Sequence, residues 1–170
     1  TLALVLTNAA NAVINDTEAT GTILEDDPAP SAWYVAPDGD NTLGQSWGSA
    51  WTSIHYAVQQ ASAGHTIYIK QGAYSITNEI LLAKALALRG GYEGSGLPGA
   101  RSSDAAATTL SRPSGAPAWN RILRIESVPC TIDTLTFANG YLGNLDPHEH
   151  GGGVKVTDST SLFTNCVIRN

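Results

Sequence analysis

Two stretches near the C-terminal end of this sequence match each other when one is laid over the other. In this superposition Ile132 falls on Phe163, Leu135 on Cys166 and Phe137 on Ile168, so apolar positions coincide. Neighbouring strands of a sheet lie about 4.8 Å apart, and such pairs are expected to be successive rungs of one ladder. An internal repeat of this kind predicts a solenoid, in which each coil buries its apolar side against its neighbours.

The same superposition places Asn139 on Asn170. Stacked asparagines stabilise parallel rungs through their side-chain amides. We therefore predict a buried asparagine ladder at this position, with a structural role and no role in ligand binding.

One predicted helix stands among many short strands. Apolar residues recur at helical spacing over residues 51–62, and Gly64 follows as a stop signal. Short apolar runs separated by Gly, Asn and Pro predict strands at 33–35, 66–69, 80–82, 86–88, 109–110, 122–125, 132–137, 154–156 and 162–168. The end of a solenoid leaves backbone groups unpaired and its apolar interior facing water. We expect the helix to cap the N-terminal end of the solenoid.

The segment 1–27 has a different pattern. Leu2, Leu4 and Leu6 alternate with small residues, and a second short apolar run covers 22–24, so we expect two strands. An isolated two-stranded hairpin is marginal in water, which predicts that 1–27 is the remnant of an incomplete β-sandwich with more strands upstream. Residues 28–32, with Pro28 and Pro30, are expected to form a stiff linker. Residues 33–170 then form the solenoid domain, which we expect to be incomplete at its C-terminus.

Composition excludes several classes of function. Charged residues make up 14% of the chain against a usual share of about 25%, the net charge is -6, and no Lys/Arg cluster is present to neutralise phosphates. Nucleic acid is therefore not an expected partner. The longest apolar stretch, 80–88, is interrupted by Lys84 and is shorter than the roughly 20 residues that span a bilayer, so no membrane insertion is expected.

The two cysteines do not form a recognisable framework. Cys130 and Cys166 are too few for a disulfide scaffold and lack the paired spacing of a zinc site. A single bridge between them stays open at this point.

The segment 1–27 resembles the end of a Calx-β domain. The residues that carry the resemblance are Leu6, Asn8, Ala9, Ala12, Gly21, Thr22, Ile23, Glu25, Asp26 and Asp27. The resemblance implies an extracellular β-sandwich and a calcium ion held in part by Asp26 and Asp27, with its other acidic ligands upstream of Thr1. The alternative is a solvated acidic turn that leads into the linker.

The region from Trp33 onward resembles the N-terminal part of right-handed parallel β-helix proteins of the pectin-lyase-like class. The motif residues are Gly39, Asp40, Thr52, Ile54, Gly64, Ile67, Tyr68, Gly72, Tyr74, Gly90, Gly91, Tyr92, Arg101 and Gly151 to Gly153. The resemblance implies an all-β fold, a single-stranded right-handed solenoid. It does not select a function, because the class includes polysaccharide lyases, other polysaccharide-degrading enzymes, autotransporter passengers and bacterial surface proteins.

No catalytic residue is carried over from this class. Its lyases act with acids that bind Ca²⁺ and a Lys or Arg base on the outer face of central coils. Lys70, Lys84 and Lys155 are the lysines of this sequence, and none stands beside a carboxylate pair. The catalytic set is therefore unknown.

Other residue groups favour structural interpretations. Residues 38–41 begin like a calcium loop but lack the later ligands, so a turn is preferred. Residues 148–150 (His-Glu-His) have no third ligand nearby in sequence and are expected to form a solvated loop. Residues 90–92 (Gly-Gly-Tyr) and the triple glycine 151–153 lack the following helix and the Lys or Ser of a phosphate-binding loop and are interpreted as tight corners. Trp51 is expected in the core, whereas Trp47 and Trp119 are left as candidates for an aromatic sugar platform.

These observations lead to two hypotheses of function. The first is a non-enzymatic module of a bacterial secreted or cell-surface protein, which uses its β-helix for adhesion or for contact with a polysaccharide or a host-surface ligand. The order of a stalk-like domain, a proline joint and a solenoid favours it. The alternative is a pectate-lyase-like polysaccharide lyase or hydrolase whose active site lies beyond Asn170. A purely structural spacer differs from the first hypothesis only in having no ligand.

Overall fold

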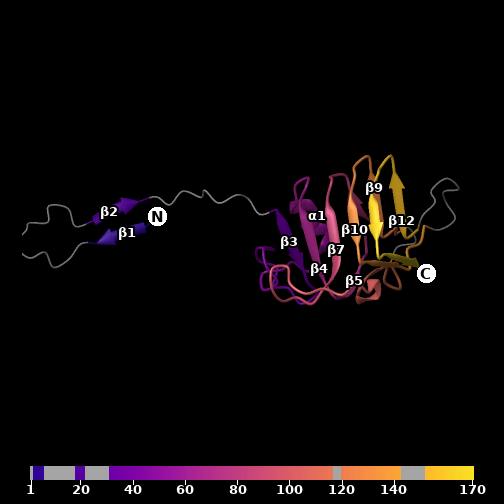
Figure 1. Cartoon of the computed structure of the whole chain (residues 1–170), viewed down its shortest axis with the longest axis horizontal. Helices are drawn as coiled ribbons and strands as arrows, with labels where there is room; N and C mark the ends of the chain where they lie inside the picture. Colours follow the sequence, from indigo (N-terminus) through magenta and orange to yellow (C-terminus); the bar gives the residue numbers. More distant parts are fainter. Residues whose placement is uncertain (1, 6–17, 22–30, 117–119, 143–151) are drawn as a thin grey trace, which may run out of the picture.

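Three parallel β-sheets dominate the computed structural model, which describes residues 2–5, 18–21, 31–116, 120–142 and 152–170 (Figure 1). Sheet 1 contains β3 (Ala32–Val35), β4 (Thr66–Lys70), β7 (Ala87–Tyr92), β10 (Thr131–Asp133) and β13 (Leu162–Thr164), in that spatial order. Sheet 2 contains β5 (Gly72–Ser75), β8 (Thr108–Ser111), β11 (Thr136–Ala138) and β14 (Val167–Arg169). Sheet 3 contains β6 (Ile80–Leu82), β9 (Leu123–Glu126) and β12 (Val154–Thr157).

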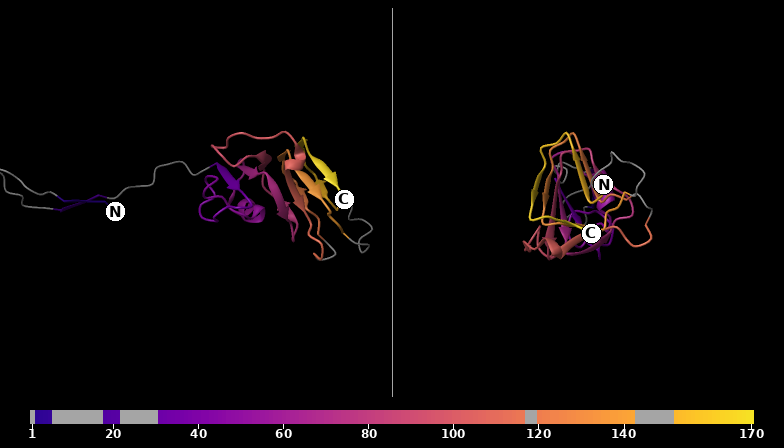
Figure 2. Two further views of the ribbon diagram at one scale, coloured as in Figure 1. Left: turned by 90° about the horizontal axis from the view of Figure 1, so that it is seen from below. Right: turned by 90° about the vertical axis from the view of Figure 1, so that its right-hand side faces the viewer.

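The chain visits the three sheets in turn, and each visit adds one coil to the stack. Thus β4, β5 and β6 form one coil, β7, β8 and β9 the next, and β10, β11 and β12 the one after it. All strand pairs within these sheets are parallel. Figure 2 shows the successive coils from two further directions. The all-β parallel β-helix that the sequence predicts is therefore confirmed.

The predicted repeat corresponds to the register of the last two coils. Ile132 pairs with Phe163 and Phe137 pairs with Ile168, as the superposition requires. The runs predicted as single strands over 132–137 and 162–168 are each divided in two, because the chain turns from sheet 1 to sheet 2 within them. At this corner Thr134 has φ 56° and its counterpart one coil later, Asn165, has φ 49°.

The predicted asparagine ladder is wrong. Asn139 and Asn170 are both exposed. Asn139 instead occupies a turn position with φ 60°, a left-handed conformation that asparagine tolerates better than most residues. Asn139 therefore has a conformational role at this position, because its short polar side chain lowers the energy of the left-handed backbone conformation.

The core lies inside the coils, where one side chain from each rung stacks on the next. On sheet 1, Leu88 and Ile132 are fully buried, and Phe163 packs against the same cluster. On sheet 2, Leu110 and Phe137 continue the apolar interior. Burial of each such side chain contributes about 1.5–3 kcal/mol, so the interior supplies the main stabilisation of the stack.

Helix α1 (Ile54–Gln60) is shorter than the predicted 51–62 segment. Ser53 is its N-cap and accepts a hydrogen bond from the Tyr56 N–H at 3.2 Å. Trp51 is buried in the core, as predicted. It is not part of the helix, however, but precedes it and forms a parallel bridge with Val35 of β3. Ile54, Ala57 and Val58 pack their apolar side into the core cluster, whereas the capping role of the helix stays a prediction.

The corner expected at Gly90 and Gly91 lies within a strand, because β7 continues through these residues to Tyr92. A short 3-10 helix, η1 (Ala105–Ala107), precedes β8. Among the described residues, no helix has the length and apolar character needed to span a bilayer.

An antiparallel pair of strands lies N-terminal to the coils in the sequence. β1 (Leu2–Val5) pairs antiparallel with β2 (Glu18–Gly21), so this part of the chain contains two paired strands, the second of them at 18–21. The second strand was expected at 22–24, a range outside the described residues. Asp26 and Asp27, the predicted calcium ligands, also lie outside them, and the assignment of 1–27 to a β-sandwich stays a prediction.

Candidate functional site

One row of side chains runs across the outer face of sheet 1. The parallel register places Tyr34 beside Tyr68, Tyr68 beside Arg89, and Arg89 beside Asp133. Alternate residues of a strand point to opposite sides, and the chain neighbours of this row, such as Ile67 and Leu88, are buried inside the coils. The row therefore faces outward and brings together residues from four successive strands of the sheet.

Aromatic rings cover the N-terminal part of this face. Tyr34 packs edge-on against Trp47 with ring centroids 4.8 Å apart, and its ring lies 5.4 Å from that of Tyr68. Tyr68 makes a T-shaped contact of 5.1 Å with Tyr92, which also lies 5.8 Å from Trp47. Tyr34 and Tyr92 are buried by these contacts, whereas Tyr68 and Trp47 are half-buried and keep part of their surface in solvent. Burial raises the pKa of Tyr34, and the nearby phenols add to the shift.

A β-bulge brings Tyr92 to this face. Tyr68 pairs with Arg89, but Lys70 pairs with Tyr92, so β7 contains one residue more than β4 between the two pairs. Gly91 adopts φ 86° within this segment, which a residue with a Cβ rarely does. A Cβ on Gly90 would also overlap the Thr134 carbonyl oxygen. The two glycines therefore permit a bend that adds Tyr92 to the outward aromatic cluster.

Arg89 is the most unusual residue of the row. Its side chain is half-buried on the outer face, and its Nε is a buried donor without a hydrogen-bond partner among the described residues. Buried polar groups in folded proteins are nearly always paired, and an unpaired donor costs about 1–3 kcal/mol. The Nε itself is closed to solvent, but Arg89 as a residue is only half-buried, so it places a positive charge between Tyr68 and Asp133 on the outer face.

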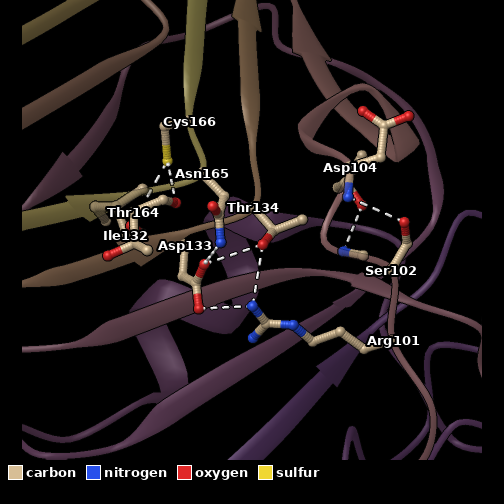
Figure 3. A network of polar contacts seen from close by, with 11 residues as sticks. Arg101, Ser102, Asp104, Ile132, Asp133, Thr134, Thr164, Asn165 and Cys166 are labelled. Atoms are coloured by element: carbon tan, nitrogen blue, oxygen red, sulfur yellow. Dashed lines mark hydrogen bonds and ion pairs between the residues drawn. The ribbon is translucent and has the colours of Figure 1, made fainter.

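Among the described residues, Asp133 forms its ion pair with Arg101 and none with Arg89. The Arg101 guanidinium donates from Nη2 to Asp133 Oδ2 at 2.7 Å and to Thr134 Oγ1 at 3.0 Å (Figure 3). Thr134 in turn donates to Asp133 Oδ1 at 2.9 Å. Arg101 also lies over the Tyr92 ring, 5.6 Å from its centroid. This network connects the segment after β7 to the C-terminal end of β10, where Asp133 lies.

The pKa values of this pair follow from its contacts. Burial alone would raise the pKa of Asp133, but the hydrogen bonds from Arg101 and Thr134 outweigh it, so the pKa lies below its usual value. Burial would lower the pKa of Arg101, and the contacts with Asp133 and Tyr92 raise it on balance. Both groups are therefore charged at neutral pH.

The outer face has a local positive charge in an acidic chain. Lys70 pairs with Asp38 at 2.8 Å. The side-chain hydrogen bond from Lys70 is the main reason why the pKa of the Asp38 carboxyl lies below its usual value. With Arg101 paired to Asp133, the positive charge of Arg89 is left over within the described part of this face. This surplus contrasts with the net charge of -6 of the whole sequence.

The outer side of sheet 3 carries charges that compensate one another. Glu79 accepts from Arg121 Nη1 at 2.8 Å and from Arg124 Nε at 2.6 Å, and Arg124 also pairs with Glu126 at 2.6 Å. A hollow near this cluster is lined by residues of α1 and β6, including His55 and Leu81. Because the ion pairs satisfy these groups internally, the cluster is better explained as a link between coils.

Asp40 and Trp47, both singled out in the sequence, form hydrogen bonds within the protein. Asp40 accepts hydrogen bonds from the Thr42 N–H at 3.0 Å and the Thr42 hydroxyl at 2.7 Å, which is the turn expected over 38–41. Trp47 packs in the aromatic cluster, and its indole donates to the Pro98 carbonyl oxygen at 2.9 Å. Trp119 and residues 148–150 lie outside the described residues. Across the described ranges, no group of three or more His, Cys, Asp and Glu side chains is placed to hold a metal ion.

The two cysteines are free thiols, so the single bridge that the sequence left open is not formed. Cys130 is buried at the corner before β10, and Cys166 is half-buried before β14. Burial raises the pKa of both thiols, which makes them poor nucleophiles. Neither cysteine is therefore a candidate for catalysis.

Arg89 and Asp133 were missed at the level of sequence. The outward residues Tyr68, Arg89, Asp133 and Thr164 follow one another at unequal intervals along the chain, so no constant spacing marks them as one row. The detectable signal was the Gly90–Tyr92 motif, which follows Arg89 directly.

Comparison with known proteins gives limited support. No family model matches the chain, and no solved structure matches it. The chain is 40% identical over 52 residues to pectate lyase PEL9 of Emericella nidulans, a match that covers 31% of this chain and 13% of that protein. The similarity and the all-parallel sheets both fit a pectin-lyase-like β-helix, whereas the Calx-β resemblance gains no support from these comparisons.

Proposed function

We propose that this chain is a polysaccharide-contacting part of a parallel β-helix protein and that the outer face of sheet 1 makes the contact. The observation that carries the proposal is the half-buried, positively charged Arg89 beside the aromatic cluster on the outer face of sheet 1. The name of the similar protein, a pectate lyase, adds support for an acidic polysaccharide as the ligand.

The chemistry of the face suits an acidic sugar chain. Arg89 offers N–H donors to a carboxylate, and charge-assisted hydrogen bonds of this kind are about twice as strong as neutral ones. The half-buried rings of Tyr68 and Trp47 offer apolar surface with polar edges beside this cation. Because the row crosses successive coils, an extended ligand can contact several of its members at once.

The binding test uses polygalacturonate oligomers titrated into the chain by calorimetry at low salt. We expect R89Q to weaken binding by about 10- to 100-fold, since the lost interaction with a charged group is worth about 1.5–3 kcal/mol. R169Q is the matched control, because Arg169 is an exposed residue on sheet 2, away from this row. Its affinity should stay within about twofold of the original chain.

Two results would overturn this proposal. One is an unchanged affinity in R89Q. The other is equal binding of a neutral polysaccharide of the same length, which would show that the cation plays no part. Fluorescence and thermal unfolding of R89Q should match those of the original chain, so that a loss of binding is not a loss of structure.

A pectate-lyase-like activity is the second candidate, favoured by the similarity to pectate lyase PEL9. The matched part of this chain spans 13% of the length of that protein, and the active site of this alternative would lie beyond Asn170. Incubation of a longer protein with polygalacturonate would then produce unsaturated ends that absorb ultraviolet light. Clear product formation would favour the enzyme over the adhesion module.

The remaining parts of the hypothesis concern biological setting. Secretion, a bacterial cell surface and adhesion are supported only by the order of the predicted segments. Calcium at Asp26 and Asp27 likewise stays a proposal that rests on the resemblance of residues 1–27. Ligand contact at sheet 1 requires neither a particular cellular location nor calcium at residues 26 and 27.

A further inference from the structure

His65 joins three segments at the N-terminal end of the coils. Its Nδ1 accepts a hydrogen bond from Trp33 Nε1 at 3.0 Å and a second from the Ser62 N–H at 3.2 Å. Trp33 belongs to β3, Ser62 follows α1, and His65 directly precedes β4. One ring nitrogen therefore holds together the first strand, the end of the helix and the start of the next coil.

The two donors fix the protonation state of this nitrogen. An indole N–H and a backbone N–H can only donate, so Nδ1 must present a lone pair to both. His65 is therefore neutral in this arrangement, with its proton on Nε2. An imidazolium would carry a proton on Nδ1 and would place it against two donors.

His55 provides a contrast within the same region. Its Nε2 lies 3.2 Å from the Glu79 carbonyl oxygen, a group that can only accept. His55 therefore donates in this contact, and it can still donate when the ring is protonated. Acid disrupts the contacts of His65 and leaves that of His55 intact.

The charged surroundings of His65 do not offset a positive ring. Lys84, from the segment after β6, donates to the Gln59 carbonyl oxygen at 3.2 Å and to the Ala61 carbonyl oxygen at 2.6 Å, and so adds a cation beside the same turn. Within the described residues, His65 forms no ion pair with a carboxylate, and its ring contacts are with Trp33 and Ser62. The acids at 25–27, which precede β3 in the sequence, lie outside those residues.

We propose that His65 is a pH-responsive latch, which holds β3 and the end of α1 against the first complete coil at neutral pH and releases them when the ring is protonated. Release also affects Trp33, whose ring stacks on Trp51 with centroids 4.9 Å apart. Trp51 bridges to Val35, so the loosening extends along β3. This device is independent of the polysaccharide-binding face.

A direct test is nitrogen-detected NMR of the histidine rings and the tryptophan indoles in the intact chain. At about pH 8, where histidine side chains are mostly neutral, we expect His65 to carry its proton on Nε2 and the Trp33 indole signal to be that of a hydrogen-bonded group. At about pH 5.5 the Trp33 signal should move to the position of a solvent-exposed indole while carboxylates stay ionised. A proton on Nδ1 at the higher pH would overturn the proposal.

A stability series gives a second test. In H65N the amide oxygen can accept hydrogen bonds without titrating, so the fall in the urea midpoint between about pH 8 and 5.5 should shrink to less than half of the original. In the control H55Q the amide can still donate to the Glu79 carbonyl, and the fall should be unchanged. An unchanged pH dependence in H65N, or a flattened one in H55Q, would contradict the latch. If H65N does not fold, the NMR result on the original chain decides alone.

Discussion

The Asp133 carboxylate binds two segments at once, the loop after β7 through Arg101 and the turn between β10 and β11 through Thr134. It receives Arg101 at 2.7 Å and Thr134 at 2.9 Å, while Asn165 from the next coil lies at 3.5 Å. Its side chain is only 16% exposed, so solvent screens the pair weakly. For the candidate site, the consequence is that Asp133 forms its ion pair with Arg101, and no ion pair with Arg89 is present among the described residues.

The lowered pKa of Asp133 predicts how this contact depends on pH. The folded-state pKa lies below the unfolded value, so the stabilisation is present above about pH 4 and is lost as pH falls through the folded-state pKa. At pH 7, D133N should reduce the free energy of unfolding by about 1–3 kcal/mol, and the difference should shrink in strong acid. Urea denaturation across pH measures this difference.

Asp104 supplies the matched control for this prediction. It caps the short 3-10 helix by accepting from the Ala106 N–H at 2.9 Å, and asparagine caps equally well. D104N should therefore change stability by less than about 0.5 kcal/mol. A loss in D133N that does not diminish in acid would show that the charge of Asp133 is not what stabilises the corner.

At the scale of elements, Glu79 connects two coils. It precedes β6 and binds both Arg121, which precedes β9, and Arg124 within β9. The Arg121 side chain is only 4% exposed. Removal of Glu79 takes one ion-pair partner from this buried guanidinium and one from Arg124, and buried charges are costly to deprive of their partners.

We therefore expect E79A to lower the free energy of unfolding by about 1.5–3 kcal/mol. E93A is the control, because Glu93 is exposed and forms no ion pair among the described residues, and its effect should stay within about 0.5 kcal/mol. Chemical denaturation of the two variants makes the comparison. Equal stability in both would mean that sheet 3 is not held by this cluster.

The elements themselves were largely predictable from sequence, because apolar periodicity records burial. The errors arose where two structures share one pattern. Trp51 fits the helical spacing, although it lies in a bridge to Val35 before the helix starts. The corner at Thr134 has neither Gly nor Pro to mark it, so two strands were interpreted as one.

The candidate site was less predictable, because it depends on register. Arg89 meets Tyr68 and Asp133 only after loops of different length and one β-bulge are taken into account. Sequence alone gives the residue types but not how these loops set the register. The unpaired Nε of Arg89 could be recognised only once the neighbouring side chains had been placed.

At the scale of the whole molecule, the coils repeat while their outer faces differ. Inside, Phe137 is fully buried, whereas Ile168 on the last described coil is 58% exposed, as expected for a rung with a neighbour on one side only. Outside, sheet 3 has paired charges and sheet 1 has aromatic rings with a surplus cation. The stacked architecture thus presents faces of different chemistry, and the binding proposal concerns sheet 1.

Amide chemical-shift mapping with a short oligogalacturonate tests this account most directly. We predict that added ligand shifts the signals of Tyr68, Arg89 and their neighbours on β4 and β7, and leaves β9 and β12 of sheet 3 unchanged. Shifts concentrated on sheet 3, or no saturable shifts anywhere in the assigned chain, would contradict the account.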